Sequence, residues 1–324
     1  MPNTHRIASW MLTTCLGCAA VGTPAGSGAL RSSEPLALGA QTRSLFGTLL
    51  YAPPLSGAEL AQRQTALFDA LAAWERAPHD ADATLWVGRR LGYLGRFREA
   101  LEVFTIGARE HPLDPRFLRH RGHRHITLRE FEAAALDLER AAELAAERPD
   151  EIEPDGQPNA RGVPLESLKS NIYYHLGLAY FLSGEFERAL PAWRSCLRFA
   201  GNPDNQCSAT HWLYMTLRRL GRDAEAAEVV STIRADFDIV DYHSYHQLCL
   251  AYRGEVDLER LWEQARARGS SSTDFATIGF GAGHWQLVEG HPARAREIFE
   301  QLCSSPSWHA FGRIAAEAEL ARLP

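Results

Sequence analysis

The sequence predicts an all-α solenoid built from stacked pairs of antiparallel helices. Ala, Leu, Arg and Glu dominate the 324 residues and β-branched runs are scarce, a composition that favours helix throughout. Apolar residues make up 45% of the chain and charged residues 23%, so most of it is expected to fold. Small and large residues also recur at fixed intervals, which is typical of a repeat architecture.

The repeated unit is a small residue, an alanine twelve residues later, and a large apolar residue four residues after the alanine. Because each unit is two antiparallel helices, the small residues are expected where the helix backbones approach, and the large ones fill the gap to the next pair. The copies are Gly88/Ala100/Phe104, Gly122/Ala134/Leu138, Gly177/Ala189/Trp193, Gly283/Ala295/Phe299, and Tyr214/Ala226/Val230, in which Tyr replaces Gly.

A turn containing glycine joins the two helices of most units, as at Gly95-Arg96, Gly184-Glu185, Gly221-Arg222 and Gly290-His291. With this turn, the pattern resembles the tetratricopeptide-repeat (TPR) family over about residues 66–309. The resemblance implies a right-handed superhelix of about five to six helix-turn-helix repeats with a C-terminal capping helix. It also implies that the first helix of each pair lines the concave face.

The repeat spacing divides the solenoid, residues 57–323, into successive units. They are a half-repeat 57–80, repeats 81–114, 115–148, 170–203 and 207–240, a degenerate pair 241–272, a repeat 276–309, and a cap 310–323. An insertion at 147–168 contains four prolines and cannot be helical throughout. Two interpretations of it remain open: a disordered excursion, or a loop folded over the groove.

The N-terminus differs in composition from the rest. Residues 1–20 combine a short charged region, an apolar run and small residues, as signal peptides do. Leu16-Gly17-Cys18 resembles the end of a bacterial lipobox, so Cys18 is a candidate lipidation site, and 21–56 are expected to form a flexible tether. The protein is therefore expected to be exported, periplasmic or anchored to a membrane by lipid; the alternative is a cytoplasmic protein with a disordered tail.

Aromatic, histidine and arginine side chains are predicted to line the concave face. The exposed side of the first helices is expected to form a partner-binding groove on this face. The residues are Trp86, Arg89, Tyr93, Arg119, His120, His123, Asn171, Tyr174, His175, His211, Trp212, Arg218, Arg219 and His284, with Met215 and Phe280 beside them.

Such a surface suits an extended peptide or a protein segment that carries a carboxylate, so the expected function is a binding scaffold. The net charge of −6 argues against nucleic acid as a partner, and any membrane contact is expected only through the lipid anchor. No metal or cofactor is expected, because Arg119, Arg121 and Arg124 would repel a cation among the histidines. The alternative function is a small-molecule or hydrolytic site formed by groove histidines and Glu151, Glu153 and Asp155 of the insertion. Oligomeric state is left open.

Overall fold

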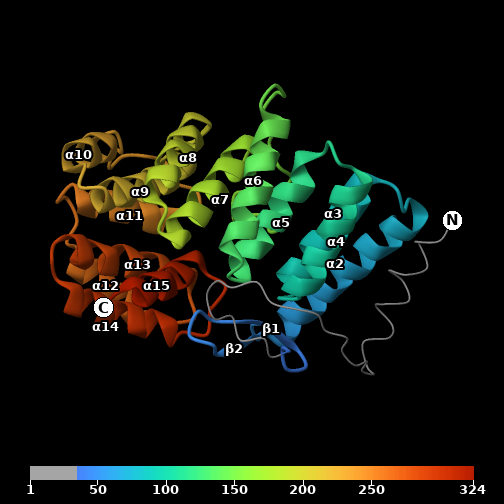
Figure 1. Ribbon diagram of the computed structural model, residues 1–324, viewed down its shortest axis with the longest axis horizontal. Coiled ribbons are helices and arrows are strands. Elements are labelled where there is room, and N and C mark those ends of the chain that lie inside the picture. The colour runs from blue at the N-terminus through green and yellow to red at the C-terminus, as the bar shows by residue number, and fades with distance from the viewer. Residues whose placement is uncertain (1–34) are drawn as a thin grey trace, which may run out of the picture.

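Helices in sequential antiparallel pairs make up nearly all of the computed structural model, which describes residues 35–324 (Figure 1). The all-α prediction is therefore confirmed. The helices are α2 (Gly57–Arg76), α3 (Ala81–Tyr93), α4 (Phe97–Glu110), α5 (Pro115–Thr127), α6 (Phe131–Ala145), α7 (Leu168–Ser183), α8 (Phe186–Arg198), α9 (Pro203–Arg219), α10 (Asp223–Ser231), α11 (His243–Tyr252), α12 (Leu258–Ala267), α13 (Thr273–Val288), α14 (Pro292–Cys303) and α15 (Phe311–Arg322).

The two helices of a pair begin in different ways. Asp80, Asp114, Ser167, Asn202 and Ser272 cap the first helices α3, α5, α7, α9 and α13 by accepting a hydrogen bond from a backbone N–H of the first turn. The second helices α4, α6, α8, α10 and α14 have no side-chain cap and instead follow a residue with positive φ. Most of these signals lie within a few residues of the helix start that they mark.

The repeated glycine interval corresponds to a close contact between the two helices of a pair. A Cβ atom on Gly122 would lie 2.7 Å from the Leu138 side chain, and one on Gly177 would lie 2.6 Å from the Trp193 ring. In both cases the partner stands sixteen residues later. In the fourth pair, Tyr214 stands at the position of the glycine and Val230 at the position of the large residue, and both side chains are buried.

Arg129 occupies the turn position that glycine fills in the other pairs. Its φ is +66°, and it is the non-glycine residue with positive φ in the described part of the chain. Its guanidinium donates to both carboxylate oxygens of Glu317 at 2.8 and 3.0 Å, and to the carbonyl of Trp308 at 2.8 Å. Glu317 is 1% exposed. An arginine therefore stands at a strained position because its side chain reaches the C-terminal helix.

Residues 308–317 and a short hairpin join the C-terminal end of the solenoid to its N-terminal half; we call this contact the closing seam. The hairpin is β1 (Ala40–Arg43) paired antiparallel with β2 (Leu49–Tyr51), and Figure 1 shows it between α14 and α5 at the lower edge. Trp308 donates its indole N–H to the Tyr51 carbonyl at 2.6 Å, and its ring packs edge-on against Phe97 at 5.4 Å. The expectation of a flexible tether over 21–56 is therefore wrong for the hairpin, because its backbone is paired and held by the seam.

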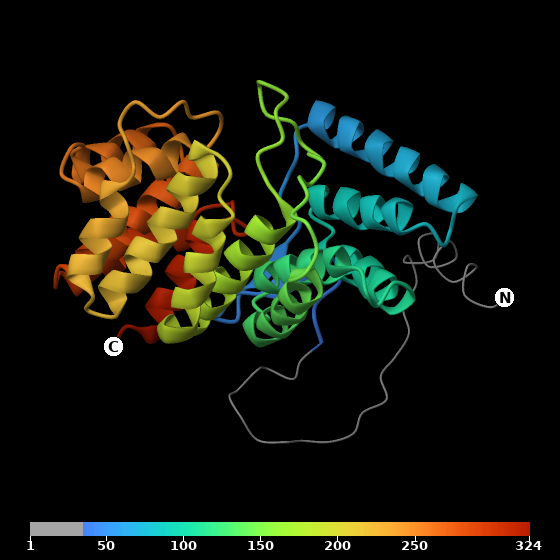
Figure 2. The same cartoon turned by 90° about the horizontal axis from the view of Figure 1, so that it is seen from above.

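The insertion after α6 is a folded loop that lies beside the inner ends of α3, α5 and α7 (Figure 2). Of the two interpretations, the loop over the groove is the one observed. The predicted signal peptide and Cys18 lie outside the described residues. Within residues 35–324, no helix combines the length and the apolar character needed to cross a membrane.

Candidate functional site

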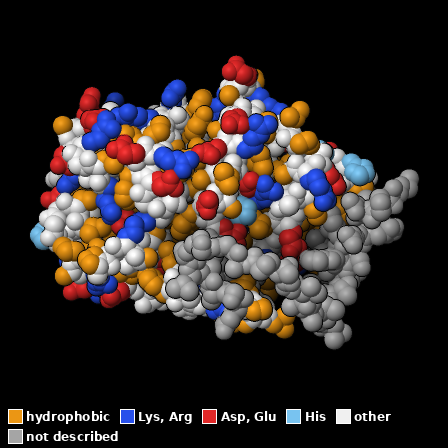
Figure 3. All heavy atoms as spheres, viewed as in Figure 1, with side chains coloured by type: hydrophobic (Ala, Val, Ile, Leu, Met, Phe, Trp, Pro, Cys, Tyr) orange, Lys and Arg blue, Asp and Glu red, His pale blue; other side chains and the backbone are white. Residues whose placement is uncertain are grey.

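The face of the molecule seen in Figure 3 carries acidic and basic side chains mixed together, without a broad area of one sign. A more specific arrangement lies on the inner faces of α3, α5 and α7, where the insertion packs. Residues 151–156 of the insertion, which we call the inner strand, run antiparallel to 166–168. Glu153 N–H donates to the Glu166 carbonyl at 2.9 Å, and Leu168 N–H donates to the Glu151 carbonyl at 2.8 Å. The inner strand is therefore an extended segment held beside the first helices.

The carboxylate of Glu153 is bound by side chains from two helices. Arg119 of α5 donates to it at 2.7 Å and the amide of Asn171 of α7 donates to the same oxygen. His120 Nε2 lies 3.7 Å from the other oxygen. Since the side chains of Arg119 and Glu153 are each 9% exposed, this is a buried, charge-assisted contact.

Two arginines of α3 bind the backbone of the same strand. Arg89 donates to the Pro154 carbonyl at 2.8 Å, and Arg90 donates to the Gly156 carbonyl at 2.9 Å. Both guanidinium groups lie over the Trp86 ring, at 4.3 and 4.7 Å from its centroid, which orients them. The α3 face thus recognises main-chain carbonyls, while α5 and α7 recognise a carboxylate.

The histidines of this region are neutral at pH 7. Burial, followed by the nearby arginines, lowers the pKa of His120 and His175 well below the usual value, and the pKa of His123 is lowered in the same way. His123 and His175 lie 4.4 Å apart, ring to ring, and both pack against Phe311 of α15. They therefore act as hydrogen-bonding and packing groups rather than as cations. No three His, Cys, Asp or Glu side chains between residues 35 and 324 are grouped closely enough to hold a metal ion.

The expectation of an open, exposed groove is wrong for α5, α7, α9 and α13, where predicted groove residues are buried. Trp212 is buried between Trp193 and Phe280, with ring centroids at 5.7 and 5.5 Å. The physical reason is that α13 packs against α9, and the C-terminal helix α15 packs against α7, so these helices cover one another's inner faces. Seven of the predicted groove residues, together with Met215 and Phe280, have at most 8% of their surface exposed: Arg119, His120, Asn171, His175, His211, Trp212 and His284.

The remaining predicted residues are half-buried. Trp86, Arg89 and Tyr93 lie on α3, and Arg218 and Arg219 lie at the end of α9. His123 of α5 and Tyr174 of α7 both pack against Phe311. The structure brings the α3, α5 and α7 residues together around the inner strand. It does not bring the α9 and α13 residues to that place.

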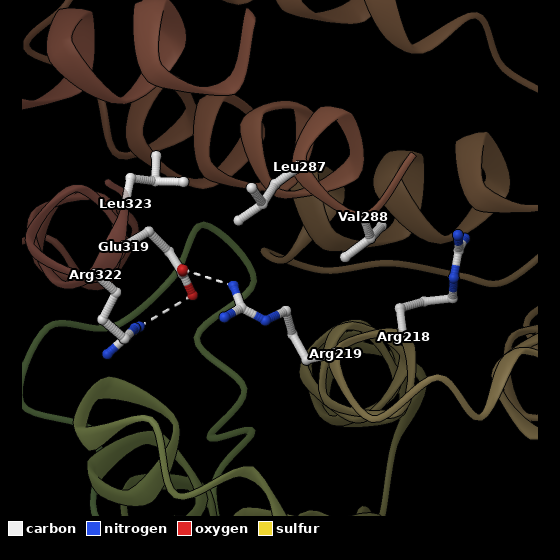
Figure 4. A pocket seen from close by; sticks show the side chains of 7 residues that line it. All are labelled: Arg218, Arg219, Leu287, Val288, Glu319, Arg322 and Leu323. Atoms are coloured by element: carbon white, nitrogen blue, oxygen red, sulfur yellow. Dashed lines mark hydrogen bonds and ion pairs between the residues drawn. The ribbon is translucent and has the colours of Figure 1, made fainter. Parts of the chain in front are cut away.

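Arg218 and Arg219 instead line a separate pocket of about 310 Å³ between α9, α13 and α15. Figure 4 shows Arg219 and Arg322 pointing toward Glu319 from two sides, at 2.6 and 3.0 Å, while Arg218 points away from them. Arg218 is paired with Glu289 at 2.7 Å. Each arginine of this pocket has a carboxylate partner within the chain, so its charge is balanced.

A hydroxyl-rich cluster near the inner strand was not predicted. Tyr242 donates to Glu166 at 2.7 Å, the Tyr174 and Tyr245 hydroxyls lie 3.0 Å apart, and Trp212 donates its N–H to Tyr174 at 2.9 Å. Burial is the main cause that raises the pKa of Glu166 to about 7. Sequence reasoning had no signal for this cluster, because its members come from the insertion and three separate helices.

Sequence reasoning named Glu153 only as one of three acidic residues of the insertion. Of those three, Glu153 alone reaches a groove histidine, while Glu151 and Asp155 are exposed. Its carboxylate is bound by Arg119 and Asn171, which leaves it poorly placed as an acid or base. Arg90 was not predicted as a groove residue, because only its neighbour Arg89 was assigned to the inward side of the helix; in the structure both arginines reach the inner strand.

No protein family and no curated protein matches the sequence. Similar solved structures include YrrB, a TPR protein with an unusual peptide-binding site, at 14% identity over 78% of this chain and 98% of that chain, with a TM-score of 0.42. A TPR protein from Parabacteroides merdae ATCC 43184 is 14% identical over 81% of this chain and 100% of that chain, with a TM-score of 0.45. Because these TM-scores are low, the fold assignment rests on the helix pairs of this chain itself.

Proposed function

We propose that this protein is a binding scaffold for an extended, acidic protein segment, and that the inner faces of α3, α5 and α7 form the binding site. The observation that supports the proposal is the inner strand. It is extended, and its carboxylate and two of its carbonyls are held by Arg119, Asn171, Arg89 and Arg90. The site therefore has the donors that an acidic segment needs, and a segment of the chain itself occupies it.

The chemistry of these contacts defines the partner. Arg89 and Arg90 bind main-chain carbonyls, which any extended peptide offers, whereas Arg119 and Asn171 require a carboxylate at one position. A glycine is also favoured three residues after that carboxylate, because a Cβ at Gly156 would overlap the Tyr93 hydroxyl. A partner segment of the form acidic-x-x-small would satisfy the same groups after it displaces the inner strand.

A synthetic peptide corresponding to residues 150–158 tests this proposal. The peptide is labelled with fluorescein and titrated into a variant in which residues 152–165 are replaced by a short Gly-Ser linker, with anisotropy as the signal. Binding should be at least tenfold tighter to this variant than to the wild-type chain, whose site is occupied. A peptide with Gln at the position of Glu153 should bind about tenfold more weakly, since one charge-assisted contact contributes about 1.5–3 kcal/mol.

The full-length Glu153→Ala variant serves as a second host, because it keeps the rest of the insertion. Arg119→Ala in either host should abolish the preference for the acidic peptide, while Arg140→Ala on the outer face of α6 should not change it. If neither folded host binds the peptide, or if both bind the acidic and the Gln peptide equally, the inner face is not a site for acidic segments.

Export remains a separate proposal, supported by residues 1–20 and by Leu16-Gly17-Cys18. Expression of the full chain in bacteria with radiolabelled palmitate should label the protein, and Cys18→Ala should remove the label. Equal labelling of the two chains, or no label in either, would contradict lipidation at Cys18.

A further inference from the structure

Among the described residues, Arg124 of α5 is an arginine of the inner helix faces that has no carboxylate partner. Its guanidinium lies 5.2 Å above the centroid of the Phe97 ring. Within residues 35–324 this guanidinium makes neither a hydrogen bond nor an ion pair, although Arg124 is half-buried. The neighbouring inner arginines differ, since Arg119 is paired with Glu153 and Arg129 with Glu317.

The groups around Arg124 are basic or neutral. His309 of the closing seam packs against the same Phe97 ring, with 6.1 Å between the Phe97 and His309 ring centroids, and its Nδ1 is buried without a hydrogen-bond partner in the described part of the chain. His123 precedes Arg124 in the helix and packs against Phe311 at 5.2 Å. Burial, and then the positive charge of Arg119, lowers the pKa of Arg124 to about 10. The site thus holds a net positive charge and an unused hydrogen-bonding atom.

The fold leaves room for this guanidinium. A Cβ on Gly92 of α3 would lie 3.1 Å from Arg124 Nη1, which is tighter than ordinary van der Waals contact. Gly92 therefore lets the arginine extend between α3 and the seam. Arg124 is also about 140° around the helix from Arg119, given about 100° per residue, so the two guanidinium groups leave α5 in different directions.

We propose that Arg124, with His123 and His309, binds a small carboxylate ligand at the closing seam. One unpaired guanidinium supplies one positive charge, which a singly charged carboxylate neutralises and to which it binds bidentately. Burial lowers the pKa of His309 to about 4, so this histidine is neutral, and in the tautomer that carries its proton on Nδ1 it offers an N–H donor. Inorganic phosphate, which is largely a dianion at about pH 8, would leave one negative charge uncompensated in a partly buried site, so a carboxylate fits better at that pH.

This ligand would bind beyond the site proposed for the acidic segment. It would contact α5, which belongs to the N-terminal half, and the 308–311 segment, which belongs to the C-terminal half. Binding should therefore stabilise the closed form of the solenoid, because a ligand that binds only the folded state raises its stability.

Thermal melting of the full-length protein tests the proposal with acetate as the probe. Sodium acetate should raise the melting temperature by about 3 °C at ten times its Kd, relative to sodium chloride at the same ionic strength. Sodium phosphate at that ionic strength should give less than half of this shift. Arg124→Gln should remove the acetate shift, and the matched control Arg109→Gln, an exposed arginine of α4, should keep it.

Arg124→Gln should also melt within about 2 °C of the wild type in chloride, because the substitution removes an unpaired charge rather than an ion pair. A much larger loss in chloride would indicate a structural arginine and overturn the proposal. The ring C–H signals of His123 and His309 in NMR spectra give a second readout, since acetate should shift them in the wild type and not in Arg124→Gln. An acetate shift that survives Arg124→Gln, or an equal shift with phosphate, would contradict a carboxylate site at Arg124.

Discussion

Replacing Arg129 by glycine sets two opposite effects against each other. Glycine at φ +66° should relieve backbone strain worth about 1 kcal/mol, and it would restore the residue type that the other pairs have at this turn. The same change removes the partner of Glu317, which is 1% exposed. Breaking a buried ion pair by removing one member costs about 3–5 kcal/mol, because the other charge is left uncompensated.

The ion pair should therefore decide the outcome. Arg129→Gly is expected to lower the free energy of unfolding by about 2–4 kcal/mol, measured by urea denaturation at pH 7. Adding Glu317→Gln to the same chain should recover most of this loss, because the orphaned charge disappears. The exposed pair Arg140–Glu143, with side chains 55% and 66% exposed, provides the control, and Arg140→Ala should cost less than about 0.5 kcal/mol.

A chain with Arg129→Gly that is as stable as the wild type, or more stable, would refute this reasoning. It would mean that the strain at Arg129 outweighs the contacts of its side chain, and that the closing seam does not depend on this ion pair. A double variant no more stable than Arg129→Gly alone would instead place the loss in the hydrogen bond to Trp308.

Two further substitutions test the packing and the titration of the interior. Gly177→Ala should destabilise the fold by about 1–3 kcal/mol in urea denaturation, because its Cβ would lie 2.6 Å from the fully buried ring of Trp193. The control Gly57→Ala, whose Cβ would have nothing within 4 Å, should be neutral or slightly stabilising. Equal effects of the two substitutions would contradict the packing argument. Glu166 has a pKa raised from 4.5 to about 7 by burial, so the folded state holds its proton more tightly and stability should fall as pH rises between these values, by up to about 3 kcal/mol. Glu166→Gln, which can still accept a hydrogen bond from Tyr242, should be more stable than the wild type by a larger margin at pH 8 than at pH 4.5. If the stability difference between the two chains is the same at both pH values, Glu166 titrates normally.

The local pattern of the sequence was sufficient to predict the helix pairs. The sixteen-residue interval from Gly177 to Trp193 predicted which side chains meet, because contacts within a pair depend only on helix geometry and the short turn between its helices. Cap residues such as Asp80 and Asp114 are local in the same way. The presence of Arg, His and aromatic side chains on the first helices follows from the register of those helices alone.

The relation between distant pairs was decided only by the tertiary structure. How sharply the solenoid turns depends on small rotations that add up from pair to pair, and no single interval in the sequence encodes their sum. This sum brings α13 against α9 and Glu317 against Arg129, so that Trp212 is buried where an open groove was expected. It also leaves the inner strand as the occupant of the remaining face, and Arg124 without a carboxylate partner within residues 35–324. The sequence by itself determined which side chains each helix presents inward, and the tertiary structure determined what each of them meets there.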